Sequence, residues 1–244
     1  MRDFDTTHLI FLAVTAAFFA LSMYVVARLP RFWQNVCFVF AALMVAGGVF
    51  FRYGMGLTLE GAISWRTLGL QMLQVCNFNL ILVLLMLVPR FELARQYSVF
   101  FSMFAASTTL ISIPNVWANY SCFHPEVFNS WCNHVFAMAL PLWMIAARRL
   151  KPRKEYVLPV WGCVLGYFTV VAAISTLLIK NGIMTVATSH SFVFKTDGIG
   201  VFELLYRYIP IPFVYLMPLL VPMFVVFVLW AWAFRNYKTE RFGS

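Results

Sequence analysis

The two side chains of this sequence most able to do chemistry together are Cys76 and His134. His134 is the only ionisable side chain, cysteine thiols aside, that lies well inside a long apolar run, because every lysine, arginine and acid lies between runs or at their edges. A charged residue at the centre of a membrane helix costs about 2.5–3.5 kcal/mol, so an ionisable residue kept there usually has a partner or a task. We expect Cys76 to be the partner of His134.

A cysteine is a nucleophile only as its thiolate, and a nearby imidazole makes the thiolate available near neutral pH. The pair therefore predicts thioester chemistry, in which the thiol of Cys76 takes an acyl group from a lipid and His134 moves the proton. The alternative is a structural histidine that donates to a backbone carbonyl, with Cys76 as a small apolar core residue.

The stretch around Cys76 is polar for a membrane helix. Gln71, Gln74 and Asn77 are spaced by three and form one stripe, whereas Cys76 shares its face with Asn79. The amides of Gln74, Asn77 or Asn79 could stabilise an oxyanion. Buried amides also hydrogen-bond neighbouring helices as structural glue, so both interpretations stay open.

The composition defines the elements that must position these residues. The chain has 244 residues, of which 62% are hydrophobic and 11% charged, and its mean hydropathy is +0.82. A membrane-spanning helix needs about 20 apolar residues. Seven runs qualify and predict an all-α, polytopic membrane protein with one domain over 1–244: 8–28, 33–51, 67–89, 96–114, 128–147, 156–179 and 210–234.

The distribution of basic residues predicts the orientation. Seven spans put twelve lysines and arginines on one face and six on the other. The positive-inside rule then places the N-terminus outside and the C-terminus in the cytoplasm. With this orientation and a helical rise of about 1.5 Å per residue, Cys76 and His134 both lie roughly 10–15 Å below the outer surface. The formal charge of +9 suits a rim that faces anionic lipid, so we expect no nucleic-acid partner.

Other polar residues support weaker predictions. In the outer segment 180–208, Lys195 or Arg207 could pair with a lipid phosphate, although solvated loop charges are the favoured explanation. Cys122 and Cys132 both lie near the outer face, where a disulfide could form in an oxidising compartment. The histidines have no metal-ligand spacing, so we expect neither a metal nor another cofactor.

Several short motifs, in order, resemble the YwaF-like integral membrane proteins of bacteria, which have a vertebrate relative that acts as a lipid acyltransferase. The start FDTTHLIF resembles a Phe-x-x-x-His pattern and places Phe4 and His8 on it. The stretch MLQVCNFNLIL resembles a Pro-Leu-His-Leu-Cys motif, with Cys76 on its cysteine. A later His and Pro correspond to His134 and Pro141, and IPIPFVYL resembles a Trp-Pro-Trp-Tyr region. Gln74 stands where the family often has His, and SFVF replaces an Asn-Tyr-Met-Phe element.

The resemblance implies Cys76 and His134 as an acyl-transfer pair and a place in the bacterial cytoplasmic membrane. Our first hypothesis is accordingly a membrane acyltransferase that acts on membrane lipids from the outer leaflet. The alternative is a non-catalytic membrane subunit or scaffold whose polar third helix faces a protein partner. A small transporter comes third, because the inner halves of the helices are almost wholly apolar.

Overall fold

The computed structural model describes residues 5–54, 70–71, 73–111, 120–186, 191–196 and 198–239. Over these residues the chain is helical and has no β-strand. Four of the described helical segments are long and apolar enough to cross a membrane: Thr6–Arg28, Arg31–Phe50, Lys154–Lys180 and Val214–Ala233. The prediction of an all-α membrane protein is confirmed, while the seven spans and the orientation of the termini stay predictions.

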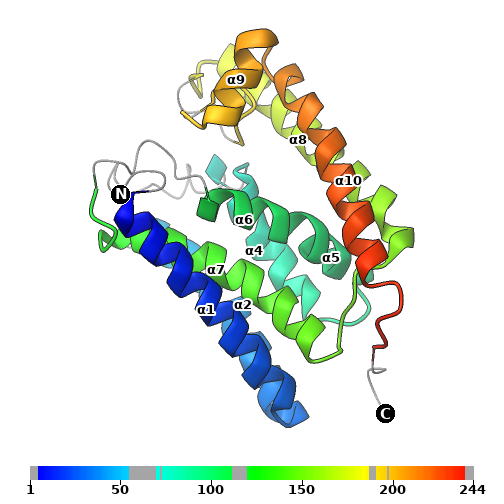
Figure 1. Cartoon of the computed structure of the whole chain (residues 1–244). Helices are drawn as coiled ribbons and strands as arrows, with labels where there is room; N and C mark the ends of the chain where they lie inside the picture. Colours follow the sequence, from blue (N-terminus) through cyan, green and yellow to red (C-terminus); the bar gives the residue numbers. More distant parts are fainter. Residues whose placement is uncertain are drawn as a thin grey trace.

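Helices α1 (Thr6–Arg28) and α2 (Arg31–Gly54) follow each other through a tight connection. α1 begins where the Asp5 carboxylate accepts a hydrogen bond from the backbone N–H of His8 at 2.8 Å, a normal N-cap. It ends at Leu29, which is extended because the next residue is Pro30. Figure 1 shows the two helices beside the helix that carries His134.

Helix α7 (Pro125–Ala146) is the central helix of the fold and packs against α1, α2 and α6. Close approach to α2 is possible because that helix presents Ala41, Ala42 and Val45, all nearly unexposed. Side-chain hydrogen bonds tie α7 to α2 and to α1. Asn129 Nδ2 donates to Gly48 O and Asn133 Nδ2 to Val45 O in α2, both at 2.9 Å; Trp131 Nε1 donates to Thr15 Oγ1 at 3.1 Å and Trp143 Nε1 to Ser22 Oγ at 2.8 Å in α1. Polar side chains thus fix the position of α7.

The third apolar run, 67–89, is interrupted within its described residues. Residues 70 and 71 are helical, residues 73 and 74 form a turn, and α4 (Val75–Met86) starts only after them. The backbone N–H groups of Leu73 and Gln74 bond to carbonyls three residues back, as in a tight turn. Cys76 therefore lies in the first turn of a helix, and not about ten residues inside a continuous one.

The fourth run is divided into α5 (Glu92–Tyr97), a π-helical turn (Ser98–Ser102) and α6 (Met103–Ile111). Its start is anchored to the connection after α7. Arg95 donates to the carbonyl of Arg149 at 2.6 Å and to the carboxylate of Glu92 at 2.9 Å. The fully buried Gln96 donates to the carbonyl of Lys151 at 2.9 Å. Burial of Arg95 and Gln96 is acceptable because both side chains have hydrogen-bond partners.

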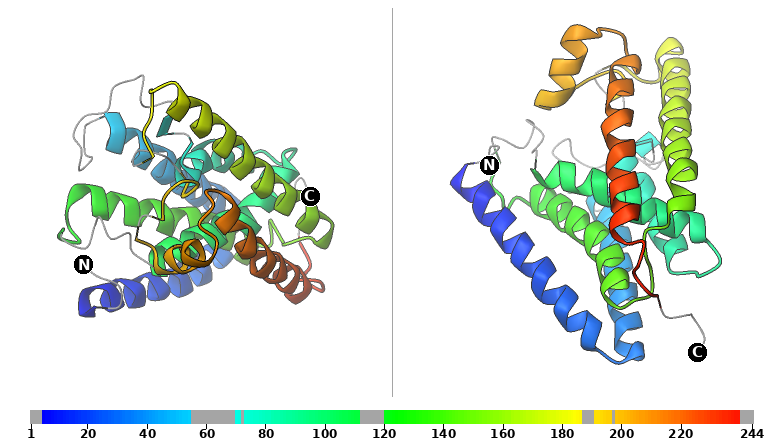
Figure 2. Two further views of the ribbon diagram at one scale, coloured as in Figure 1. Left: turned by 90° about the horizontal axis from the view of Figure 1, so that it is seen from above. Right: turned by 45° about the vertical axis from the view of Figure 1, so that its right-hand side comes forward.

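Helices α8 (Val157–Lys180) and α10 (Met217–Ala233) lie side by side, with α9 (Gly200–Tyr208) at the end of the molecule where α8 ends and α10 begins (Figures 1 and 2). Short 3₁₀ turns precede α8 and α10, at Lys154–Tyr156 and Val214–Leu216. The last helix thus starts later than residue 210, because Pro210 and Pro212 cannot donate backbone hydrogen bonds. Pro141 and Pro222 lie inside α7 and α10 without ending them.

Candidate functional site

His134 and Cys76 are in contact. The Nε2 atom of His134 lies 3.3 Å from the Sγ atom of Cys76. The imidazole belongs to the central helix α7, and His134 is only 7% exposed. The sequence predicted similar membrane depths for Cys76 and His134, which is compatible with this contact. The packing of α4 against α7 brings the two side chains together.

The other ring nitrogen of His134, Nδ1, determines the tautomer of the imidazole, and the tautomer determines whether His134 or Cys76 donates the hydrogen between them. Nδ1 lies 2.7 Å from the carbonyl oxygen of Ser130, one turn earlier in α7. A carbonyl can only accept, so Nδ1 carries the hydrogen and donates it. The neutral ring then has its lone pair on Nε2, which faces the thiol. His134 is both a donor to a backbone carbonyl and the partner of Cys76, which unites the two interpretations that its sequence position left open.

This tautomer makes His134 a base with respect to the thiol. The S–H of Cys76 donates to Nε2 at 3.3 Å, and transfer of that proton creates a thiolate beside an imidazolium. The first turn of α4 reinforces the thiolate, because the N-terminus of a helix favours negative charge. The arrangement can therefore generate a nucleophile.

The helix break that places Cys76 in that first turn is held by a segment distant in sequence. Ser191 is 1% exposed; its hydroxyl donates to the carbonyl of Leu73 at 2.5 Å and accepts from the backbone N–H of Val75 at 2.9 Å. Its own backbone N–H donates to Oε1 of Gln74 at 2.8 Å. Tyr167 of α8 also donates to the Leu73 carbonyl, at 2.8 Å. We call these contacts of Ser191 and Tyr167 with residues 73–75 the break clamp.

The backbone around Ser191 adopts a conformation that non-glycine residues rarely take. Ser191 and Phe192 have φ angles of 56° and 61°. The hydroxyl of Tyr215 donates to the carbonyls of Phe192 and Lys195, and the backbone N–H of Phe213 donates to Val193. The 3₁₀ turn before α10 and the residue preceding that turn therefore hold the segment around Ser191, which in turn holds the break before α4.

Sequence reasoning missed Ser191 and Tyr167. A serine in a connecting segment and a tyrosine in an apolar helix carry no pattern that links them to Cys76. The only signal was that SFVF, which starts at Ser191, corresponds to an element of the resembled family.

The structure places the other predicted site residues as follows. The Gln74 amide oxygen is bound by Ser191, so only its NH₂ group could serve an oxyanion. Asn77 is buried, and its Nδ2 donates to the carbonyl of Gln71 at 2.9 Å across the break. Asn79 lies in α4, but its side chain is outside the described residues. The oxyanion role of the three amides stays a prediction.

The predicted headgroup residues lie in the segment that leads to α9 and on α9 itself. Arg207 is exposed in the last turn of α9, and Lys195 is half-buried, with its carbonyl accepting from Tyr215. A role in binding a lipid phosphate stays a prediction for both.

Of the two residues on the expected N-terminal pattern, Phe4 lies outside the described residues, whereas His8 is fully buried. Nε2 of His8 lies 2.8 Å from the carbonyl of Leu110, and its ring meets Trp131 edge to face. These contacts tie the start of α1 to the end of α6.

None of the five cysteines, all of which lie in the described ranges, forms a disulfide, so Cys122 and Cys132 are not bonded to each other in this structure. Within the described ranges, no group of three or more His, Cys, Asp or Glu side chains is arranged to hold a metal ion.

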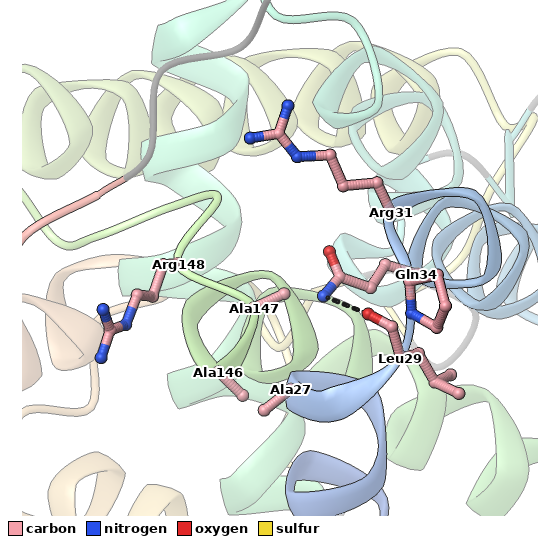
Figure 3. Close-up of a pocket in the computed structure, with 8 residues that line it drawn as sticks. Ala27, Leu29, Arg31, Gln34, Ala146, Ala147 and Arg148 are labelled. Carbon is pink, nitrogen blue, oxygen red and sulfur yellow. Dashed lines mark hydrogen bonds between the residues drawn. The ribbon is translucent and has the colours of Figure 1, made fainter. Parts of the chain in front are cut away.

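A separate cavity of about 500 Å³ lies where the α1–α2 connection meets the end of α7. Figure 3 shows its lining, with Gln34 donating to the carbonyl of Leu29 at 3.0 Å and the side chains of Arg31 and Arg148 at its edges. Ala146 in its wall is twelve residues from His134, which is about 18 Å along a helix. The cavity is therefore not part of the Cys76–His134 site.

These features define a class: an integral membrane protein of packed helices with a thiol–imidazole pair between two of them. The family model of the TMEM164 family matches residues 4–231, and the chain belongs to that family. No curated protein and no solved structure matches the chain. The expected membership of a membrane protein family is thus confirmed at the level of the TMEM164 family, and the YwaF-like assignment and the bacterial source stay predictions.

Proposed function

We propose that this protein is a membrane-embedded acyltransferase in which Cys76 carries the acyl group and His134 acts as base and acid. The observation that carries the proposal is the 3.3 Å separation between Sγ of Cys76 and Nε2 of His134, with Nδ1 held by Ser130. A nucleophile, a base within hydrogen-bond reach and a third group that orients the base are the usual components of covalent catalysis.

The proposed reaction has two halves. In the first, His134 takes the thiol proton, Cys76 attacks the carbonyl carbon of a lipid ester, and the ester oxygen leaves with the proton from Nε2. The product is a thioester on Cys76 and a lysolipid. In the second half, His134 takes a proton from the hydroxyl of an acceptor lipid, which attacks the thioester and releases the thiol.

Lipid is the substrate class because the pair lies among apolar helices. Large apolar side chains cover the outside of α1, α2 and α10, as expected of helices that face lipid. The same proposal places the N-terminus outside and the pair in the outer half of a bacterial cytoplasmic membrane, supported by the count of twelve basic residues against six. The amides near Cys76 and the charges of Lys195 and Arg207 are its candidate contacts to the oxyanion and headgroup.

The test is acyl exchange between a labelled phospholipid and a lysolipid in proteoliposomes. Cys76→Ser should abolish exchange, and His134→Ala should lower its rate by about 10²–10⁴-fold, the usual contribution of a positioned base. Cys163→Ser is the matched control, because Cys163 is an exposed free thiol on α8, and it should exchange like the wild type. Full exchange by the Cys76→Ser variant would overturn the proposal.

A second measurement addresses the alternative of a non-catalytic subunit. That alternative requires Cys76 to be unreactive and the protein to copurify with another membrane protein in fixed stoichiometry. Mass spectrometry after treatment with iodoacetamide reports the alkylation of Cys76 directly. Alkylation that is equally slow in the wild type and the His134→Ala variant would favour the subunit.

A further inference from the structure

The hydroxyl of Tyr97 is buried and has no hydrogen-bond partner among the described residues. Tyr97 is 4% exposed and is the last residue of α5. Nearly all buried polar groups in proteins are paired, so an unpaired one calls for an explanation. One explanation is a donor that is kept for a ligand.

Tyr97 and Cys76 pack into the same part of the fold. The two residues belong to one apolar cluster with Val75 and Phe101, formed where α4 and α5 meet α8 and α10. His134, by contrast, belongs to α7, so base and hydroxyl come to Cys76 from different helices.

The backbone next to Tyr97 is also unusual. Residues Ser98–Ser102 form a π-helical turn, and the N–H of Met103 bonds to the carbonyl of Ser98, five residues back. Single π-helical turns within α-helices are rare and occur frequently at functional sites. Here the turn begins directly after Tyr97.

We propose that the Tyr97 hydroxyl donates a hydrogen bond to the oxyanion formed when Cys76 attacks an acyl carbonyl. This assignment rests on the proposed function and adds a third catalytic residue to it. The reaction needs such a donor, because the tetrahedral intermediate carries its charge on the former carbonyl oxygen.

Two other candidate donors near Cys76 already have acceptors. Tyr167 donates its hydroxyl proton to Leu73, and Asn77 donates to Gln71. Gln74 is bound by Ser191 only through its amide oxygen, so its NH₂ group stays a second candidate donor beside Tyr97. The Tyr97 hydroxyl proton has no acceptor in the described part of the chain.

The proton and electron balance is complete without another reactant. The thiol proton moves to His134, the S–C bond forms, and the carbonyl becomes an oxyanion that accepts the O–H of Tyr97. When the carbonyl reforms, the C–O bond to the leaving alcohol breaks, and that alcohol takes the proton from His134. Tyr97 keeps its proton throughout.

The experiment compares two reagents that modify Cys76 by different mechanisms, with the site read by mass spectrometry. A p-nitrophenyl fatty acyl ester acylates the thiol through an oxyanion, whereas iodoacetamide alkylates it by direct displacement without one. In Tyr97→Phe, acylation of Cys76 should slow by about 10²–10³-fold, the usual effect of removing one oxyanion donor. Alkylation should stay within about twofold of the wild type, since His134 still activates the thiol.

Ser98→Ala is the matched control, because Ser98 also has a buried hydroxyl without a described partner, one residue further on. It should leave both rates unchanged. Unchanged acylation in Tyr97→Phe, or equal slowing by both reagents, overturns the proposal. If Tyr97→Phe does not fold, fluorotyrosine at position 97 replaces it, and its more acidic hydroxyl should accelerate acylation; no acceleration overturns the proposal.

The same experiment separates this inference from the proposed function. Suppose that Cys76 of the wild type is acylated, that Tyr97→Phe slows this acylation, and that the wild type exchanges no lipid acyl groups. This result overturns the proposed acyltransferase function and keeps the role of Tyr97 as oxyanion donor. A wild-type Cys76 that reacts with neither reagent overturns both.

Discussion

Replacing Ser191 by alanine tests whether the break clamp positions Cys76. The substitution removes the hydroxyl but keeps Cβ, so the cost of a positive φ of 56° is the same in both proteins. Leu73 loses one donor but still accepts from Tyr167. Val75, which is 4% exposed, loses the acceptor of its backbone N–H.

The size of the effect follows from these contacts. A buried N–H left without an acceptor costs about 1–3 kcal/mol, and the lost bond to Leu73 contributes about 1 kcal/mol. Side-chain hydrogen bonds in membrane proteins average about 0.6 kcal/mol, which favours the lower half of that range. We expect a loss of about 2 kcal/mol in the free energy of unfolding, or about 4–8 °C in melting temperature for a chain of this size.

The assay is thermal unfolding in detergent, together with the iodoacetamide rate at Cys76. Ser191→Ala should melt at lower temperature and alkylate at a different rate, because the first turn of α4 loses its anchor. Ser98→Ala removes an equally buried hydroxyl that has no described partner and should change neither value. Equal melting temperatures and equal alkylation rates for the two variants would refute the role given to the break clamp.

Three further substitutions test the packing that holds α7 and its neighbours. A Cβ at Gly48 would lie 3.2 Å from an asparagine amide of α7, so Gly48→Ala should destabilise the protein by about 1–3 kcal/mol. Gly47→Ala is the control, because a Cβ there would lie in open space, and it should not destabilise the protein. Equal melting temperatures for the two variants would contradict this prediction. His8→Phe removes the contact to the Leu110 carbonyl, so it should lower the melting temperature while Cys76 still alkylates at the wild-type rate; a slower rate would assign His8 to the site. Gln96→Leu leaves the Lys151 carbonyl and the Arg153 N–H without Gln96 as partner and removes one donor from Glu92, which keeps Arg95. It should cost about 2–4 kcal/mol in unfolding measurements, and no loss would show that the anchor of α5 is dispensable.

The types of two residues were enough to predict the centre of the candidate site. His134 stood out because an imidazole inside an apolar run is costly, and Cys76 because a thiol at similar depth is the group such a base can activate. Their 3.3 Å contact agrees with that pairing, while their catalytic roles stay a proposal. Membership of a membrane protein family was also expected from sequence and is confirmed for the TMEM164 family, while the YwaF-like assignment stays a prediction.

The break in the third run was not accessible from the sequence. Gln74 and Val75 are compatible with a continuous helix, and only the hydroxyl and backbone of Ser191 provide the alternative partners for Gln74 Oε1 and the Val75 N–H. Such long-range hydrogen bonds leave no periodic pattern in the chain. Tyr97 was missed for the same reason, since an unpaired hydroxyl is a property of its surroundings.

The sequence by itself determined that the protein is helical and embedded in a membrane, because runs of about 20 apolar residues have no other stable environment. It also determined which two residues could react, because the chemistry of a thiol and an imidazole belongs to the side chains. Only the tertiary structure decided the tautomer of His134, through the carbonyl of Ser130, and the place of Cys76 in a first helical turn, through Ser191. Both depend on distances between groups from different parts of the fold, and the packing of helices sets those distances.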